Sequence, residues 1–384
     1  MVIDNEFGVY IHIPFCRQKC FYCDFPSFAG RENLIDDYLN ALSEEMRLVT
    51  AELGQGEKLS PSTIYIGGGT PSILDSDQLN RLLTIIREKI DLAGVAEFTV
   101  EVNPCSVTAE KLHLMRQSGI NRISIGIQSF DDGCLKSIGR LHSGREALQA
   151  VSMAQMAGFD NISIDLMYGL PGQSMDMLEE TVATALKLEV RHISVYGLQL
   201  EEGTVFARQQ AMGKLLLPED ELVEEMYDYI VRELPIGGFQ RYEISNYARP
   251  GYESRHNCLY WQDVPYLGFG AGAHSYWSDR RYENPVNIKE YIQVINGSRV
   301  MSMVEEEIDT KAHMEEYCFL GLRMTRGINR ESFRNRFACD VHDIFGNAID
   351  NMVSKGLLAE NEEAVFLTEL GMKYGNIVFA EFIL

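Results

Sequence analysis

Short runs of apolar and β-branched residues recur six times in the first half of the chain, and each is followed by a stretch with helical periodicity. Between the runs, apolar residues three or four positions apart mark one face of a helix, as Leu79, Leu82 and Ile86 do. The runs lie at residues 8–13, 63–66, 97–102, 122–125, 161–166 and 192–196. Six strands that alternate with helices predict parallel pairing and a barrel-like α/β domain.

Polar residues in front of the helical stretches indicate where helices begin. Ser76 and Asp77 precede the second helix, Thr108 the third and Ser174 the fifth. After about residue 200 the alternation weakens. A long helix is expected over residues 219–234, with Leu222, Val223, Met226, Ile230 and Leu234 facing inward.

The rest of the chain predicts two further parts. Residues 237–282 are rich in Gly, Tyr and Asn and are expected to form strands and ordered loops. The acidic run 305–309 predicts a solvated surface and the entry to a helix, and 310–384 predicts three or four short helices followed by a β element at 364–367. We therefore expect a barrel at 1–235, a β-rich extension at 236–305 and a small helical or winged domain at 306–384.

Composition and charge narrow the function classes. The 384 residues carry a formal net charge of −22, which disfavours binding to nucleic acid or a basic membrane anchor. The chain contains no run of about 18 apolar residues, so no transmembrane helix is predicted. Residues 1–8 include Asp4 and Glu6 and no basic residue, so no signal peptide is expected. These features predict a cytoplasmic protein, with peripheral contact at a membrane left open.

Three of the eight cysteines, Cys16, Cys20 and Cys23, stand together directly after the first predicted strand. Three thiolates can each bind one iron of a [4Fe–4S] cluster and leave the fourth iron open to another ligand. A zinc site is the alternative, and it would require a fourth ligand, for which His12 is the nearest candidate. The scattered cysteines are interpreted as unreactive: Cys105, Cys134, Cys318 and Cys339.

A second motif, the glycine-rich turn Gly67-Gly68-Gly69-Thr70-Pro71, follows the second predicted strand. Glycines let a ligand approach exposed backbone groups closely. Together the two motifs resemble the radical S-adenosylmethionine (SAM) superfamily, in which such a loop contacts the amino group of the methionine moiety. The resemblance implies a TIM-like (β/α)₆ partial barrel and two cofactors, a [4Fe–4S] cluster and SAM.

Further motifs resemble one branch of that superfamily, the oxygen-independent coproporphyrinogen III oxidases and the HemW-type haem chaperones. They stand at successive predicted strand ends, where (β/α) barrels build active sites, and cover about residues 8–280. The resemblance implies that Cys16, Cys20 and Cys23 ligate the cluster. It implies SAM contacts from Tyr10, Tyr22, Gly68, Gly69, Thr70, Glu101, Gln128, Arg140, Asp165 and Gln199.

Two departures separate this chain from the oxidases. Those enzymes carry one more cysteine directly after the triad, at the position that Phe25 occupies here, and a longer segment than the fifteen residues before Cys16. Phenylalanine neither binds metal nor reacts. Both departures resemble the haem chaperones instead, and enzymatic decarboxylation of coproporphyrinogen is accordingly disfavoured, whereas SAM cleavage is left open.

A motif of the chaperone group, HNxxYW, occurs at residues 256–261. Histidine or cysteine can ligate haem iron, and aromatic rings offer flat faces to a porphyrin. The candidate haem-binding residues are His256, Asn257, Cys258, Tyr260 and Trp261. The alternative is that His256 and Trp261 only pack the lower barrel and order a loop.

The leading prediction is a haem chaperone that binds haem as cargo and delivers it to haem-requiring proteins. Its partners would be haem-accepting proteins, of which membrane-bound respiratory enzymes are one candidate, and an electron donor for the cluster. The alternatives are the coproporphyrinogen III oxidase and another porphyrin-directed radical SAM enzyme, such as a methyltransferase. Because haem propionates and the SAM carboxylate are anionic, the site must be locally basic, and Arg140 is the group we name for this role.

Overall fold

A twelve-stranded sheet forms the main body of the computed structural model, which describes residues 6–54, 57–297 and 304–383. Its strand order is β14-β13-β12-β11-β1-β4-β5-β6-β7-β8-β10-β9. The central strands are parallel to one another: β1 (Gly8–Ile13), β4 (Thr63–Gly68), β5 (Glu97–Val102), β6 (Arg122–Gln128), β7 (Asn161–Tyr168) and β8 (His192–Gly197). The six predicted strands and their parallel pairing are confirmed.

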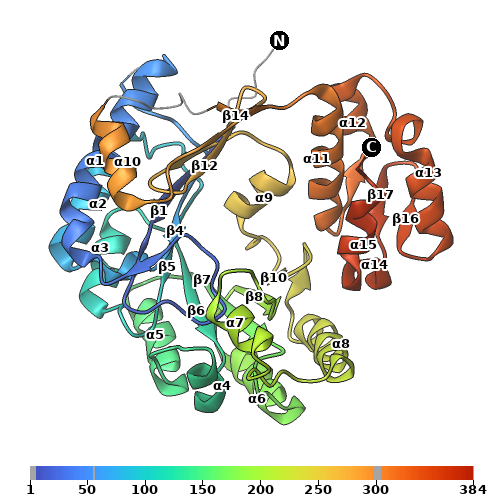
Figure 1. Ribbon diagram of the computed structural model, residues 1–384, viewed down its shortest axis with the longest axis horizontal. Coiled ribbons are helices and arrows are strands. Elements are labelled where there is room, and N and C mark those ends of the chain that lie inside the picture. The colour runs from blue at the N-terminus through green and yellow to red at the C-terminus, as the bar shows by residue number, and fades with distance from the viewer. Residues whose placement is uncertain (1–5, 55–56, 298–303, 384) are drawn as a thin grey trace.

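Helices cover the outer face of the curved sheet (Figure 1). They are α1 (Ile35–Glu52), α2 (Ser76–Lys89), α3 (Ala109–Gln117), α4 (Asp132–Ser137), α5 (Gly144–Met156), α6 (Met175–Lys187), α7 (Val205–Ala211) and α8 (Asp220–Ile236). Thr108 and Ser174 cap α3 and α6 as predicted, whereas α2 is capped one residue earlier than expected, by Asp75. Most of the apolar helix faces pack against Val, Ile and Leu of the strands in one large core. Helices α4 and α7 instead contribute Cys134 and Phe206 to a smaller cluster with Phe21 of the cysteine loop.

The segment after α8 extends the sheet at both edges. Strands β9 (Gln240–Arg241) and β10 (Asn246–Ala248) join the β8 edge. On the other side β11 (Tyr266–Phe269) lies parallel to β1 and is followed by β12 (His274–Trp277), β13 (Arg280–Glu283) and β14 (Val304–Glu307). The predicted strands of this region are therefore present, in the same sheet as the barrel.

Two helices of this segment were not predicted from the sequence. Helix α9 (Arg255–Trp261) carries the HNxxYW motif, and α10 (Ile288–Asn296) packs against α1. The seven residues of α9 are too few to show a helical period, and the helix begins because Ser254 caps it. Figure 1 shows α9 between the sheet and the C-terminal helices.

The C-terminal part has its own core. Helices α11 (Thr310–Arg323), α12 (Arg330–Phe337), α13 (Val341–Ser354), α14 (Glu369–Lys373) and α15 (Gly375–Ala380) surround a small sheet of β15 (Ile328–Asn329), β17 (Ala364–Leu367) and β16 (Leu358–Glu360). Strand β17 confirms the β element predicted at 364–367. In the acidic run, Asp309 caps α11 as predicted for a helix entry, but the preceding residues form β14.

The short remaining elements complete the description: β2 (Phe15–Cys16) pairs with β3 (Phe28–Ala29), and η1 (Glu32–Leu34) and η2 (Pro71–Ile73) are single 3₁₀ turns. Among the described residues, no helix combines the length and apolarity required to cross a membrane. The expectation about a signal peptide concerns residues 1–8, of which 1–5 lie outside the described residues.

Candidate functional site

The cysteine triad lies at the C-terminal end of the central strands, in the loop that follows β1. Cys16 is buried in β2, and Cys20 and Cys23 are half-buried in the turn beyond it. The Cys16 Sγ lies 3.6 Å from the Thr70 Oγ1, and the Cys20 Sγ lies 3.7 Å from an Arg140 guanidinium nitrogen. Two of the predicted SAM residues, from different strand ends, are therefore in direct contact with the predicted cluster ligands.

The arrangement of the thiols fits an iron–sulfur cluster better than zinc. Tetrahedral zinc would hold its sulfur ligands about 3.8 Å apart. In the part of the chain that the structure describes, the triad is not among the groups whose ligand atoms all lie within 4.8 Å of one another. His12 is not available as a fourth ligand, because its ring nitrogens lie 2.9 Å from the Tyr10 hydroxyl and 2.8 Å from the Pro26 carbonyl.

Burial raises the pKa of the Cys16 and Cys23 thiols. A buried thiol needs a nearby positive charge to be held as the thiolate that binds metal. Bound iron supplies that charge, so the three cysteines fit the ligand set of a [4Fe–4S] cluster with one iron left for another ligand.

Close packing explains why the turn after β4 is glycine-rich. Gly68 has a φ of 107°, and a Cβ at this position would lie 2.4 Å from the His12 ring. A Cβ on Gly69 would lie 2.7 Å from the Phe15 carbonyl oxygen. Only glycine therefore lets this turn lie against the strand that leads into the cysteine loop.

Two carboxyl groups stand inside the barrel below this turn. The Glu101 carboxylate accepts hydrogen bonds from the Tyr65 hydroxyl at 2.8 Å and from the Gly68 amide at 3.2 Å. Asp165 accepts a hydrogen bond from the Ser124 hydroxyl at 3.3 Å. Burial raises the pKa of Asp165 and raises that of Glu101 to about 7. These carboxyls are placed to accept hydrogen bonds from an amino or hydroxyl group of a ligand.

Arg140 supplies the positive charge that the sequence analysis expected. One guanidinium nitrogen donates to the Gly126 carbonyl, and Nε is buried without a hydrogen-bond partner among the described residues. Arg140 also lines a pocket with Arg17, Gln18, Cys20, Thr70 and Asn103. A cation with a free donor beside a carboxyl-lined interior fits a ligand that carries both a carboxylate and an ammonium group, as SAM does.

The remaining predicted SAM residues lie around the same end of the barrel. Tyr10 and Tyr22 are half-buried, and burial raises the pKa of both. Gln128 is buried and has a φ of 69° at an irregularity in the β6–β7 pairing. Gln199 is exposed in the loop after β8 and is the least enclosed of the set.

The HNxxYW motif lies at the opposite end of the strands. The His256 ring contacts Gly8 at the start of β1, and its Nδ1 lies 2.7 Å from the hydroxyl of Thr63 at the start of β4. Its Nε2 lies 2.9 Å from the Tyr260 hydroxyl, and the residue is 1% exposed. Burial lowers the pKa of His256 to about 3, so the ring is neutral at physiological pH.

Trp261 connects the motif with the C-terminal part. The Trp261 ring lies under the Arg323 guanidinium of α11, with 4.3 Å from the guanidinium carbon to the ring centroid. Asn257, Cys258 and Tyr260 are half-buried. His256 and Trp261 thus have the packing contacts that the alternative interpretation of the motif expects, while their haem-binding role stays a prediction.

Sequence reasoning missed three residues inside the barrel. Tyr65 connects β4 with Glu101, the Glu97 carboxylate accepts the Arg255 and His256 backbone amides at 3.0 and 3.1 Å, and Arg122 is almost fully buried. Tyr65 could have been found from the alternation of β4, since it stands two residues before Gly67 on one face. Glu97 and Arg122 stand at predicted strand starts, where sequence alone gives no sign of their partners.

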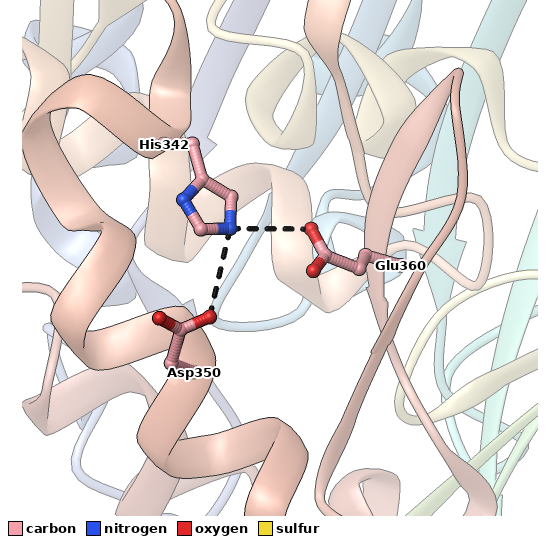
Figure 2. Close-up of side chains that lie close together, drawn as sticks. All are labelled: His342, Asp350 and Glu360. Carbon is pink, nitrogen blue, oxygen red and sulfur yellow. Dashed lines mark ion pairs between the residues drawn. The ribbon is translucent and has the colours of Figure 1, made fainter.

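A second cluster of possible ligand atoms lies on the C-terminal part (Figure 2). The His342 Nε2 is 3.8 Å from the Asp350 carboxylate and 3.4 Å from that of Glu360. Glu360 is also paired with the Arg330 guanidinium, and Asp350 is exposed. We interpret the cluster as surface ion pairs, because the arginine already neutralises one of the carboxylates.

Comparisons with known proteins agree with this geometry. The family model described as the radical SAM superfamily matches residues 10–185, and that described as the HemN C-terminal domain matches 308–373. The chain is 40% identical to the heme chaperone HemW of Bacillus subtilis over 98% of this chain and 99% of the relative. It is 33% identical to HemW of Escherichia coli over 98% of both.

Among solved structures, coproporphyrinogen III oxidase (HemN) from Escherichia coli is similar, with a TM-score of 0.85. The match covers 98% of this chain and 90% of that one at 22% sequence identity. This likeness confirms the expected radical SAM α/β fold with its helical C-terminal part.

Proposed function

Since the chain belongs to the HemW family of haem chaperones within the radical SAM superfamily, we propose that it binds haem and delivers it to haem-requiring proteins. The observation that carries the proposal is the match to the HemW relatives over 98% of this chain. Phe25 also supports the haem chaperone over the oxidase. Its side chain is 59% exposed beside the cysteine loop, and it offers no ligand or reactive group where the oxidases are expected to have a cysteine.

The same end of the barrel is proposed to hold the cofactors. Cys16, Cys20 and Cys23 would bind the [4Fe–4S] cluster, which when reduced supplies an electron to SAM. Arg140 would bind the SAM carboxylate and Glu101 its amino side. Further contacts are proposed for Tyr10, Tyr22, Gly68, Gly69, Thr70, Gln128, Asp165 and Gln199. The helices outside the sheet and the barrel walls would keep water from this interior.

For haem, we propose the five motif residues on and beside α9. Direct ligation by His256 would require α9 to move away from β1 and β4, because both ring nitrogens already have partners. Cys258 is more accessible, but burial raises its pKa to about 12, so iron would have to displace the proton. Either residue gives a ligand whose loss is visible in the absorption spectrum.

The partners of the protein are proposed on the same basis. Haem-accepting proteins would take up the cargo, and membrane-bound respiratory enzymes are one candidate class, reached by peripheral contact. An electron donor would reduce the cluster. The net charge of −22 predicts that contact surfaces on such partners are basic.

A transfer experiment tests the function. The anaerobically reconstituted chain is loaded with haem, separated from free haem and mixed with an apo-haem protein whose holo form has a distinct Soret band. Growth of that band faster than from an equal amount of haem bound to serum albumin supports delivery. A Soret band on the chain that does not move to the acceptor contradicts it.

A second arm addresses the coproporphyrinogen III oxidase. The chain is incubated anaerobically with SAM, a reductant and coproporphyrinogen III. We expect no protoporphyrinogen IX, and its clean production would reverse the ranking of the two functions. A haem titration of His256→Ala and Cys258→Ser, with the half-buried His342→Ala on the C-terminal part as a control, identifies the ligand by loss of the Soret shift.

A further inference from the structure

A continuous line of contacts runs through the barrel from the HNxxYW helix to the glycine-rich turn after β4. The His256 ring is stacked on Tyr65, with 5.2 Å between ring centroids and 27° between the planes. The Tyr65 hydroxyl donates to the Glu101 carboxylate at 2.8 Å. The other oxygen of that carboxylate accepts the Gly68 amide of the glycine-rich turn at 3.2 Å.

Each residue in this line has a fixed orientation. His256 is held from both sides of its ring, by Thr63 at 2.7 Å and by Tyr260 at 2.9 Å. The Tyr65 ring also stacks with the Tyr10 ring, with 6.2 Å between centroids and 28° between the planes. A ring that is fixed by hydrogen bonds and stacked on a second ring restricts where the second ring's hydroxyl can point.

We propose that His256 is a positioning residue of the SAM site: through Tyr65 it fixes the Glu101 carboxylate that orients the Gly68 turn. The motif histidine then acts on the cofactor end of the barrel, whichever residue ligates haem. This inference rests on the proposed SAM site but not on haem binding. The proposal gives the HNxxYW motif a role at the SAM site, which lies at the opposite end of the barrel strands.

The test measures SAM affinity and not turnover. The full chain is reconstituted with its cluster, and SAM binding is titrated by equilibrium dialysis and by the change in the EPR spectrum of the reduced cluster. Tyr65→Phe removes the hydroxyl and keeps the stacked ring, and we expect it to weaken SAM binding about ten-fold. His256→Ala removes the stacked ring, and we expect a loss of similar size.

The chain offers a matched control. Tyr291 is also buried and donates its hydroxyl to a buried carboxylate, that of Glu45, at 2.6 Å, and burial raises the pKa of Glu45 to about 7, as for Glu101. This pair lies between α1 and α10 on the outside of the barrel. Tyr291→Phe therefore reports the cost of losing a buried Tyr–Glu bond without any effect on the SAM site, and its SAM affinity should equal that of the wild type.

A double variant separates positioning from general destabilisation. If His256 acts through Tyr65, adding His256→Ala to Tyr65→Phe weakens SAM binding by no more than about two-fold beyond Tyr65→Phe alone, because the shared link is already broken. If His256→Ala does not fold, Thr63→Val replaces it, since this change removes only the hydroxyl that holds the ring.

The outcomes are distinct. A wild-type chain that does not bind SAM would contradict the proposed SAM site. A wild type that binds SAM while His256→Ala (or Thr63→Val in its place) and Tyr65→Phe keep its affinity within about two-fold would overturn the positioning role. Fully additive losses in the double variant would also overturn it, because they would place the two residues on separate routes to the site.

Discussion

The two ends of the barrel are made from the same strands, but their polar groups differ in how many hydrogen-bond partners they have. We call the N-terminal ends of the strands, where α9 packs, the closed end, and the C-terminal ends, which carry the cysteines and the glycine-rich turn, the open end. At the N-terminal end, both nitrogens of the His256 ring have hydrogen-bond partners, from β4 and α9, and the Glu97 carboxylate of β5 accepts two backbone amides of α9. At the C-terminal end, the three cysteines belong to no group of ligand atoms within 4.8 Å of one another in the described part of the chain, and the Arg140 Nε has no partner there. Glu101 is buried, and its pKa is raised.

The difference between the two ends is one of degree, because the Trp261 Nε1 on α9 and the Arg122 Nε at the start of β6 also have no hydrogen-bond partner among the described residues. Buried polar groups are normally satisfied within the protein, because an unpaired one costs about 1–3 kcal/mol. Groups left incomplete are therefore candidates for ligand contacts, whereas completed groups stabilise the fold. The comparison predicts that substitutions at the C-terminal end act on cofactor binding directly. Substitutions at the N-terminal end act on stability, and they reach the SAM site only through the contacts of His256, Tyr65 and Glu101.

The largest expected effect is on the iron content. Cys20→Ala should reduce it from about four irons per chain to nearly none, because two thiolates do not retain a [4Fe–4S] cluster. Cys258→Ser, on α9 at the other end, should leave it unchanged. Iron and acid-labile sulfide are measured after anaerobic reconstitution. Equal iron in wild type and Cys20→Ala would remove the ligand assignment.

The second effect concerns the closed end. Leu259 on α9 is 5% exposed and lies against Gly8 at the start of β1. Leu259→Ala should lower the free energy of unfolding by about 3 kcal/mol, because it leaves a cavity between the helix and the barrel. Urea unfolding followed by circular dichroism measures it. A loss below about 1 kcal/mol would show that α9 is only loosely attached, and the proposed difference between the ends would fail.

The sequence predicted the open end much better than the closed one. The triad and the glycine turn are contiguous motifs whose spacing states their chemistry, and the six strands follow from runs of apolar residues. The closed end is assembled from Thr63, Glu97 and His256, which are distant in the sequence and meet only through the register of parallel strands. No local pattern shows such partners, and the seven residues of α9 are too few to show a period.

The third effect is a pH dependence at the open end. The folded-state pKa of Glu101 is about 7, above the usual 4.5, so the folded protein binds this proton more tightly than the unfolded chain does. Its contribution to stability therefore falls as the pH rises from about 4.5 to about 7. Glu101→Gln removes this dependence, on the order of 1 kcal/mol per pH unit at its steepest.

Urea unfolding of the cofactor-free protein under reducing conditions, at pH 5, 6, 7 and 8, tests this dependence. The stability of Glu101→Gln relative to the wild type should rise across the series and level off above pH 7. Phe25→Ser, which is exposed and leaves both Glu101 and Glu45 in place, should run parallel to the wild type across the series. A constant difference between Glu101→Gln and the wild type would mean that Glu101 is ionised throughout.

The smallest effect is expected at the rim of the open end. Phe25 is 59% exposed, in contrast to Leu259, so Phe25→Ser should change the free energy of unfolding by less than about 0.5 kcal/mol. The iron content should also stay at the wild-type value, because phenylalanine contributes no ligand. A clear loss of haem binding in Phe25→Ser, with stability and iron unchanged, would show that the cargo contacts this rim and that the open end serves haem as well as SAM.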